Sequence, residues 1–261
     1  MCGRYAASRR PEDLVEEFEV DEQPEQVLPA NYNVAPTDDV YAVLERPPKG
    51  QPDAVPVRTL RAVRWGLVPS WAKDPSIGNK MINARMESVA DKPAFKKAFA
   101  KRRCLLPADG YFEWYGQIKG KKQPFFITPS DGRPLAMAGL YELWRDSSKA
   151  DDDPDRWLWS CTVLTTTAED DLGRIHDRMP LLVERVRYSA WLDPAHDDPD
   201  ELRGLLVPAA PGRLTAFPVS TEVNSVRNNG PELIEPIPLD GAVEGAVGGA
   251  PSGADDQQQL F

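Results

Sequence analysis

Short strand patterns that do not alternate regularly with helices limit the fold of this chain more than any other feature. Residue runs typical of strands occur over 103–107, 110–117, 123–128, 134–143 and 157–166, and a last strand is expected near 214–219. The helical patterns are short: one after Ser8, a longer one over 91–103, and three around 169–173, 184–192 and 198–206. A doubly wound parallel sheet requires strict alternation of strands and helices. This order therefore predicts an α+β domain with a mixed, barrel-like β core flanked by short helices.

The length and composition predict one domain followed by a tail. Of the 261 residues, 1–239 carry the strand and helix patterns, whereas 240–261 are rich in Gly and Ala and end in QQQLF, which predicts a flexible tail. The sequence has no apolar run long enough to span a bilayer and no signal-peptide pattern, so we expect a cytoplasmic protein. Cys2, Cys104 and Cys161 form no C-x-x-C pair. We expect a monomer that uses no metal and no other cofactor.

The charge of the chain is unevenly distributed. The net charge is −10, which alone argues against a nucleic-acid partner. Residues 57–125, however, contain fifteen Lys or Arg and only five Asp or Glu, a local excess of ten positive charges. Because local potential rather than total charge attracts a polyanion, this segment predicts a nucleic-acid surface. Trp65 and Trp71 flank GLVPS inside it; we expect Trp65 in the core and Trp71 exposed, where its ring can stack on a base.

The position of Cys2 indicates chemistry at the amino terminus. Removal of Met1 leaves an amine and a thiol on adjacent carbons. Three further side chains are candidates for proton transfer or positioning. Glu113 lies between two tyrosines on one face of a strand, so partial burial would raise its pKa towards neutrality. His176 lies in a turn, HDRMP, before an apolar segment, and Asn83 shares one side of an extended segment with Arg85 and Glu87.

The motifs of this chain resemble those of the SRAP family, the SOS response-associated peptidase-like proteins. MCGRYA, NYNVAP, WGLVPSW, INARMES, RRCLLPADGYFEW, QPFFI, IHDRMP and VNSVRNNGPELIEP occur in the family's order between Met1 and about Pro238. The resemblance implies a single α+β domain, a basic groove for single-stranded DNA, and covalent capture of abasic sites by the N-terminal cysteine. It implies a catalytic set of Cys2, Asn83, Glu113 and His176. It also implies DNA contacts from Arg4, Asn33, Trp71, Arg85 and Arg102 or Arg103. Some members have two adjacent tryptophans where this chain has Ser70 and Trp71, so one stacking surface is missing.

The chemistry of the residues agrees with this resemblance. An amine attacks the open-chain aldehyde of an abasic deoxyribose to give an imine, and a thiol on the neighbouring carbon closes a five-membered thiazolidine. Only an N-terminal Cys2 carries both groups. His176 is then a candidate acid for opening the sugar ring, Glu113 a proton shuttle, and Asn83 a positioning residue. The family name adds a peptidase activity of the same Cys2 and a role in the SOS response to DNA damage. We also expect a lyase side activity of Cys2.

Two other functions remain open from the sequence alone. N-terminal-nucleophile amidohydrolases also begin Met-Cys-Gly, although the later motifs expected of them are missing here. A non-catalytic binder of single-stranded or modified DNA would need the basic groove but not Cys2. Separately, the terminal QQQLF resembles the Gln-x-x-Leu-Phe motif that docks bacterial repair proteins on the replicative sliding clamp. It predicts clamp contacts through Gln257, Leu260 and Phe261 and a location at replication forks.

Overall fold

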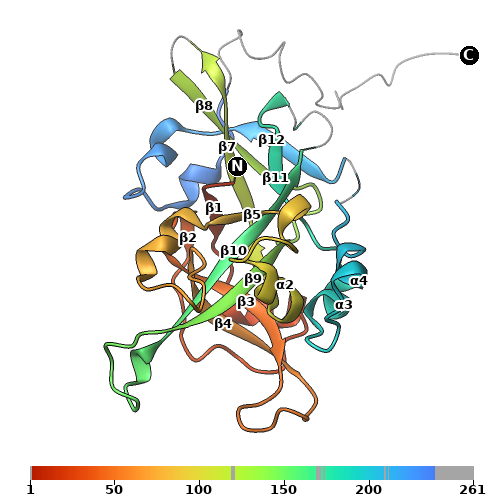
Figure 1. Ribbon diagram of the computed structural model, residues 1–261. Coiled ribbons are helices and arrows are strands. Elements are labelled where there is room, and N and C mark those ends of the chain that lie inside the picture. The colour runs from red at the N-terminus through yellow and green to blue at the C-terminus, as the bar shows by residue number, and fades with distance from the viewer. Residues whose placement is uncertain are drawn as a thin grey trace, which may run out of the picture.

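The fold is described from a computed structural model, which covers residues 2–118, 121–168, 172, 174–208, 210 and 212–238. The predicted tail, 240–261, and its candidate clamp contacts Gln257, Leu260 and Phe261 lie outside the described residues. Within the described part of the chain, two sheets and a set of short helices form the molecule (Figure 1). None of the helices in these ranges is long and apolar enough to cross a membrane.

A closed five-stranded barrel forms the centre of the fold. Strand β10 pairs with β4, β4 with β3, β3 with β6, β6 with β9, and β9 returns to β10. The β10–β4 pairing is parallel and the other four are antiparallel, so the barrel is mixed, as the sequence predicts. Its strands are β3 (Asp39–Arg46), β4 (Val57–Trp65), β6 (Arg103–Ala108), β9 (Leu135–Arg145) and β10 (Trp157–Thr167).

Two short strands pair with the end of β10 that extends beyond the barrel. Strand β5 (Asn83–Arg85) runs parallel to β10, with Asn83 opposite Val163 and Arg85 opposite Thr165. On the other edge of β10, β11 (Arg178–Pro180) pairs antiparallel, with Arg178 opposite Thr167. The end of β10 therefore brings together two segments that are more than ninety residues apart in sequence.

A second sheet lies against the barrel and carries the amino terminus. Its strand order is β12-β8-β7-β1-β2. Tyr5 on β1 pairs with Val34 on β2 and with Tyr111 on β7, so β1 is held on both edges. The members are β1 (Tyr5–Ala7), β2 (Asn31–Val34), β7 (Gly110–Ile118), β8 (Lys121–Pro129) and β12 (Leu214–Pro218).

The helices are short and cover the outside of the barrel; α2 (Lys96–Lys101), α3 (Tyr188–Leu192) and α4 (Pro199–Arg203) gather on one side of it (Figure 1). Helix α1 (Pro11–Glu17) follows β1 and buries Leu14. The helix expected over 91–103 begins only at Lys96, where no side chain caps it, and Asp91 pairs with Arg203 instead. The remaining helices are 3₁₀ turns at Pro75–Lys80, Met86–Ser88, Pro154–Arg156, Arg185–Arg187, Thr221–Asn224 and Pro231–Ile234.

The core consists of an outer and an inner part. On β3, Tyr41 and Val43 pack outwards with the helices, whereas Val40, Ala42 and Leu44 pack inwards, as the period of two requires. The inner cluster is continuous between the barrel and the second sheet, and Cys2 and Tyr5 belong to it. The amino-terminal residues Cys2 and Tyr5 therefore pack directly on side chains from the barrel interior.

Candidate active site

Cys2 lies immediately before β1 and is completely buried. The side-chain amide of Asn83 donates a hydrogen bond to the Cys2 carbonyl at 2.6 Å. The Cys2 Sγ lies 3.9 Å from the Arg4 carbonyl. Burial raises the pKa of the Cys2 thiol far above its ordinary value, and the negative charge of Glu113 raises this pKa further. The resting sulfur is therefore a neutral thiol.

Glu113 projects towards Cys2 from β7, and its position follows from strand alternation. Phe112 belongs to one hydrophobic cluster and Trp114 packs against the same cluster, whereas Tyr111 and Tyr115 pack on the other face with Cys2. Glu113 shares that second face and is only 3% exposed. Burial raises the pKa of Glu113 to about 7, against the opposing effect of the positively charged amino terminus. A carboxyl group with this pKa can both release and accept a proton near neutral pH.

His176 reaches the same neighbourhood from the turn before β11. Its Nδ1 accepts a hydrogen bond from the Arg178 backbone N–H at 3.0 Å, which assigns the proton of a neutral imidazole to Nε2. Asp177 Oδ1 lies 2.9 Å from Nδ1 and would accept from it after protonation. Burial lowers the pKa of His176, and the charge of the amino terminus lowers it further.

Buried polar atoms around Cys2 have no partner among the described residues. They are the Asn83 Oδ1 and the hydroxyl oxygens of Tyr5 and Tyr111. Burial raises the pKa of both tyrosines. Because an unpaired buried polar group costs free energy, these atoms indicate a place built for polar groups of a ligand or water. The sequence does not single out Tyr5 and Tyr111 as functional, although each lies inside a quoted motif next to a predicted site residue.

The four predicted catalytic residues therefore come from four segments. Cys2 precedes β1, Asn83 begins β5, Glu113 is on β7 and His176 precedes β11. A hydrogen bond joins Cys2 and Asn83, and electrostatic interactions connect Cys2 with Glu113 and Glu113 with Asp177. The arrangement offers a thiol, a carboxyl group that titrates near neutrality, and a neutral imidazole.

Two of the predicted DNA contacts are available at the surface. Trp71 is 58% exposed in the loop after β4. Arg85 is exposed at the end of β5, two residues beyond Asn83. Trp65, in contrast, is fully buried and packs edge-on against Tyr5, with ring centroids 5.0 Å apart. The exposed Trp71 and the buried Trp65 agree with the sequence expectation.

Arg4 and Asn33 connect the amino-terminal strands to the segment near the end of the described chain. The Arg4 guanidinium donates to Asn33 Oδ1 at 2.6 Å and to the Val223 carbonyl at 2.8 Å. The buried Asn33 amide donates in turn to the carbonyls of Val223, Ser225 and Asn228. Asn33 therefore has a structural role: its buried side chain holds residues 223–228 in place and is not exposed at the surface. Arg4 is half-buried, and its Nε has no partner among the described groups.

The structure removes Arg103 from the predicted DNA contacts. Its side chain is 2% exposed and donates to the carbonyls of Phe99, Ala100, Trp191, Asp193 and His196. Burial lowers the pKa of Arg103 to about 10. It ties α2 and the end of α3 to the barrel, so its guanidinium does not reach a ligand. Arg102 pairs with the buried Glu142 at 2.7 Å and keeps a quarter of its side chain exposed.

Arg178 is a further residue at the edge of this site that the sequence reasoning does not assign. Its guanidinium donates to both carboxylate oxygens of Glu87, at 2.5 and 3.1 Å, and to the Thr165 carbonyl at 2.6 Å. Glu87 lies in the 3₁₀ turn Met86–Ser88, so it does not continue the extended side of Asn83 and Arg85 that the sequence suggested. The HDRMP motif contains Arg178, but only the strand pairing shows that it meets Glu87.

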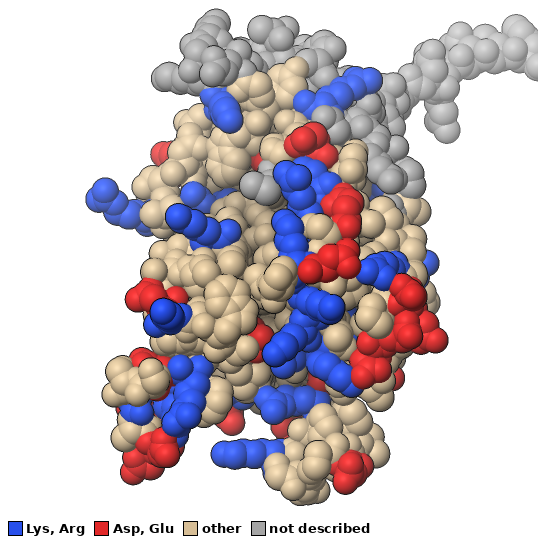
Figure 2. Space-filling view, viewed as in Figure 1, with Lys and Arg blue, Asp and Glu red and all other residues tan. Residues whose placement is uncertain are grey.

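Cationic side chains gather along the middle of one face (Figure 2), over the region of β10, β5 and α2 in Figure 1. Acidic side chains lie to one side of them, towards α3 and α4. Among the side chains of the basic segment that the structure describes, the exposed cations are Lys73, Lys80, Arg85, Lys92, Lys96, Lys97, Lys101 and Lys122. The separation of positive and negative charge along the sequence therefore corresponds to separate cationic and acidic regions on this face (Figure 2).

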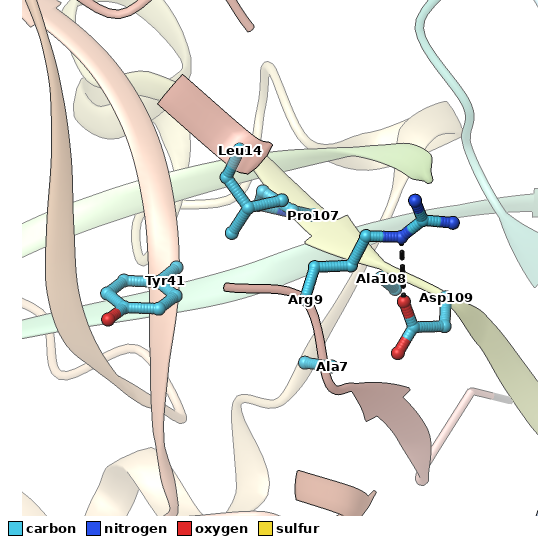
Figure 3. Close-up of a pocket in the computed structure, with 7 residues that line it drawn as sticks. All are labelled: Ala7, Arg9, Leu14, Tyr41, Pro107, Ala108 and Asp109. Atoms are coloured by element: carbon cyan, nitrogen blue, oxygen red, sulfur yellow. Dashed lines mark hydrogen bonds and ion pairs between the residues drawn. The ribbon is translucent and has the colours of Figure 1, made fainter. Parts of the chain in front are cut away.

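A small cavity lies near α1 and the start of β7, and it is not the site (Figure 3). Arg9 and Asp109, which form an ion pair at 3.2 Å, close one side, and Leu14 and Tyr41 close the other. Its volume of about 10 Å³ has room for about one water molecule. Among the residues that the structure describes, no group of three or more His, Cys, Asp or Glu side chains could hold a metal ion.

Comparisons with known proteins place the chain among related sequences. The family described as "SOS response associated peptidase (SRAP)" matches residues 1–226. "Abasic site processing protein YoqW" of Bacillus subtilis is 38% identical over 236 residues, which cover 90% of this chain and 99% of that protein. "Abasic site processing protein YedK" of Escherichia coli is 34% identical, covering 91% and 100%. "Abasic site processing protein HMCES" of Gallus gallus is 34% identical, covering 92% and 79%.

Solved structures agree on the fold. A crystal structure of a protein from Bacteroides thetaiotaomicron superimposes with a TM-score of 0.75 at 22% identity, covering 90% of this chain and 100% of the other. One from Bordetella bronchiseptica gives a TM-score of 0.67 at 28% identity, covering 84% and 100%. These likenesses confirm the architecture predicted from the strand order.

Proposed function

This chain belongs to the SOS response associated peptidase family, and on that premise we propose that it captures abasic sites in single-stranded DNA through Cys2. Related proteins that are named for abasic site processing support this proposal. The observation that carries it is the convergence of Asn83 and Glu113 on the amino-terminal Cys2. A general thiol enzyme would not need its cysteine at the first position of the mature chain.

The reaction begins when Met1 is removed and Cys2 gains a free amine. The neutral amine, with a reference pKa of about 8, attacks the C1′ aldehyde of the ring-opened sugar. Loss of one water gives an imine. The Cys2 thiol then adds to the imine carbon: the new C–S bond forms, and the thiol proton goes to the nitrogen. The product is a thiazolidine that joins protein and DNA, with one water released overall and no change of oxidation state.

Each residue around Cys2 has a role in these reaction steps. The Asn83 amide fixes the main chain of Cys2, so that amine and thiol face the same carbonyl carbon. Glu113, with a pKa of about 7, takes the proton from the attacking amine and returns it to the departing hydroxyl. His176, neutral with its proton on Nε2, assists opening of the closed sugar by proton transfer at the ring oxygen. The unpaired Tyr5 and Tyr111 hydroxyls are available to polar groups of the intermediate.

The exposed cations and Trp71 would bind the strand on either side of the lesion. Arg85 lies two residues from Asn83, and a phosphate bound there lies close to the reacting sugar. The ring of Trp71 offers a base a stacking surface. We further propose that the protein acts as a cytoplasmic monomer, and that 240–261 form a tail that takes it to the sliding clamp at replication forks. Autopeptidase or lyase activity of Cys2 is a side reaction of the same groups.

A denaturing gel tests the proposal. An abasic single-stranded oligonucleotide should give a slow-migrating adduct with the full chain and none with Cys2→Ala. The matched control inserts one alanine between Met1 and Cys2, which keeps the thiol but separates it from the amine, and it too should give no adduct. Adduct from either variant at the wild-type yield contradicts the proposal. Release of ammonia from glutamine without any adduct would instead favour an amidohydrolase.

A further inference from the structure

Glu87 is an acidic residue on a cationic surface, and its carboxylate is held by Arg178. Both guanidinium nitrogens NH1 and NH2 of Arg178 contact the two oxygens of Glu87, at 2.5 and 3.1 Å. This is the bidentate geometry with which arginine binds carboxylates and phosphates alike. The Arg178 side chain is 12% exposed, whereas the Glu87 side chain is 49% exposed. Glu87 therefore covers the outward edge of an arginine that is otherwise fixed in the protein.

Arg178 is held in place without Glu87. Its NH2 also donates to the Thr165 carbonyl at 2.6 Å, and its backbone pairs β11 with β10. Its backbone N–H binds His176, so the arginine is tied directly to the candidate active site. The guanidinium would thus keep its position if the carboxylate left.

A second arginine lies on the other side of Glu87. The hydrogen bond from Arg178 lowers the pKa of Glu87, and the charge of Arg85 contributes to the same shift. Strand pairing explains this proximity, because Arg85 on β5 and Arg178 on β11 flank opposite edges of β10 near Thr165. The carboxylate thus lies where two guanidinium groups converge beside the site.

We propose that Glu87 is an internal competitor for DNA, whose carboxylate occupies in the free protein the position that a backbone phosphate takes between Arg178 and Arg85. The inference rests on the proposed function, because it needs a single strand as the ligand. A half-exposed carboxylate–arginine pair is only weakly stabilising, so a phosphate can replace it. The exchange weakens binding to every strand alike, whereas only an abasic strand gains the covalent bond that retains it. Glu87 therefore lowers the non-covalent affinity for every single strand, and retention of an abasic strand depends on the covalent bond.

Equilibrium binding of an undamaged, fluorescent single strand tests this inference. The measurement uses the full chain with Cys2→Ala, so that covalent chemistry does not contribute. At about 50 mM salt, Glu87→Gln should tighten binding roughly fivefold to tenfold, and the slope of log K against log salt should steepen by about 0.7. Both changes follow because the variant binds the phosphate without first breaking the Arg178–Glu87 ion pair, so that one more net ionic contact forms on binding.

Two controls separate this role from a general charge effect. Asp91→Asn neutralises another exposed carboxylate that is paired with an arginine, Arg203, and should leave the salt slope unchanged. In an Arg178→Gln background, Glu87→Gln should give no gain, because the arginine that it releases is gone. A persistent gain in that background, or weaker binding by Glu87→Gln alone, overturns the inference but leaves the proposed function intact. Failure of the Glu87-bearing protein to bind any single strand overturns the proposed function itself.

Discussion

The Asn83 side-chain amide donates a 2.6 Å hydrogen bond to the carbonyl of Cys2, a residue 81 positions earlier in the chain. This bond joins the start of β5 to the amino terminus and orients the main chain that carries both proposed nucleophiles. The other end of the Asn83 side chain, Oδ1, is buried without a partner among the described residues. One side chain thus fixes the nucleophile and leaves an acceptor facing the site.

Asn83→Ala should slow adduct formation about a hundredfold, because misplacement of a reacting group by about 1 Å costs this much. Loss of one hydrogen bond should lower the free energy of unfolding by only about 1 kcal/mol. Single-turnover crosslinking rates and urea unfolding measure the two effects. Asn79→Ala is the matched control, because exposed Asn79 lies nearby but only accepts from Arg64. Equal rates for Asn83→Ala and the control would exclude a positioning role.

Glu113 should make the fold less stable as pH rises. Its folded pKa of about 7 lies above the ordinary value of 4.5, so the folded state binds more protons between these values. Stability therefore falls from about pH 4.5 to 7, by roughly 3 kcal/mol at most. Glu113→Gln mimics the protonated acid and removes this loss. Urea unfolding at pH 5 and pH 8 should show a stability gain for the variant only at pH 8.

The same substitution should remove proton transfer from the reaction. The wild-type crosslinking rate should change near pH 7 as Glu113 titrates, and Glu113→Gln should be slower by about 10²-fold or more without that inflection. A variant that is more stable at pH 8 yet slower is the expected combination. Wild-type rate and pH profile in Glu113→Gln would remove the residue from the mechanism.

His176→Gln should be slow only on a sugar that must be opened. With natural abasic DNA, we expect crosslinking to slow by about 10²-fold, typical of a lost general acid. With an oligonucleotide that carries an acyclic aldehyde, which cannot close into a ring, the variant should react at the wild-type rate. An equal defect on both substrates would show that His176 acts after ring opening or only supports the structure.

Substitution of Trp71 should affect DNA binding alone, whereas substitution of Trp65 should affect the stability of the fold. Trp71→Ala should weaken single-strand binding by about 1–3 kcal/mol through loss of one stacked base, with unchanged unfolding, because the ring is 58% exposed. Trp65→Ala should lower the free energy of unfolding by about 3–5 kcal/mol, because the fully buried ring leaves a cavity. Fluorescence anisotropy and urea titration measure the two. A stability loss in Trp71→Ala would contradict its exposed position.

Much of the fold followed from local sequence patterns. The sequence pattern predicted β6 to β10 within a few residues, although β6, β9 and β10 are buried on both faces over much of their length. It also placed Glu113 on the same face as Tyr111 and Tyr115. The closure of the barrel could not be predicted from local patterns, because the pairing of β10 with both β9 and β4 depends on contacts between distant segments.

The sequence could not separate structural from exposed arginines. Arg102 and Arg103 are adjacent in one basic run, yet Arg103 binds five main-chain carbonyls and Arg102 pairs with Glu142. Those carbonyls belong to α2, α3 and the loop that follows α3, which only the tertiary fold brings to Arg103. The pairing of Glu87 with Arg178 was hidden for the same reason, because 91 positions separate them.

The intact mass of the protein before and after incubation with an abasic oligonucleotide tests the central claim most directly. Before incubation, the account predicts the mass of the chain without Met1. After incubation, it predicts a species whose mass is that of this chain plus the oligonucleotide minus one water. Adduct formed by protein that retains Met1, or an adduct mass without the loss of water, would contradict capture by the amine and thiol of Cys2.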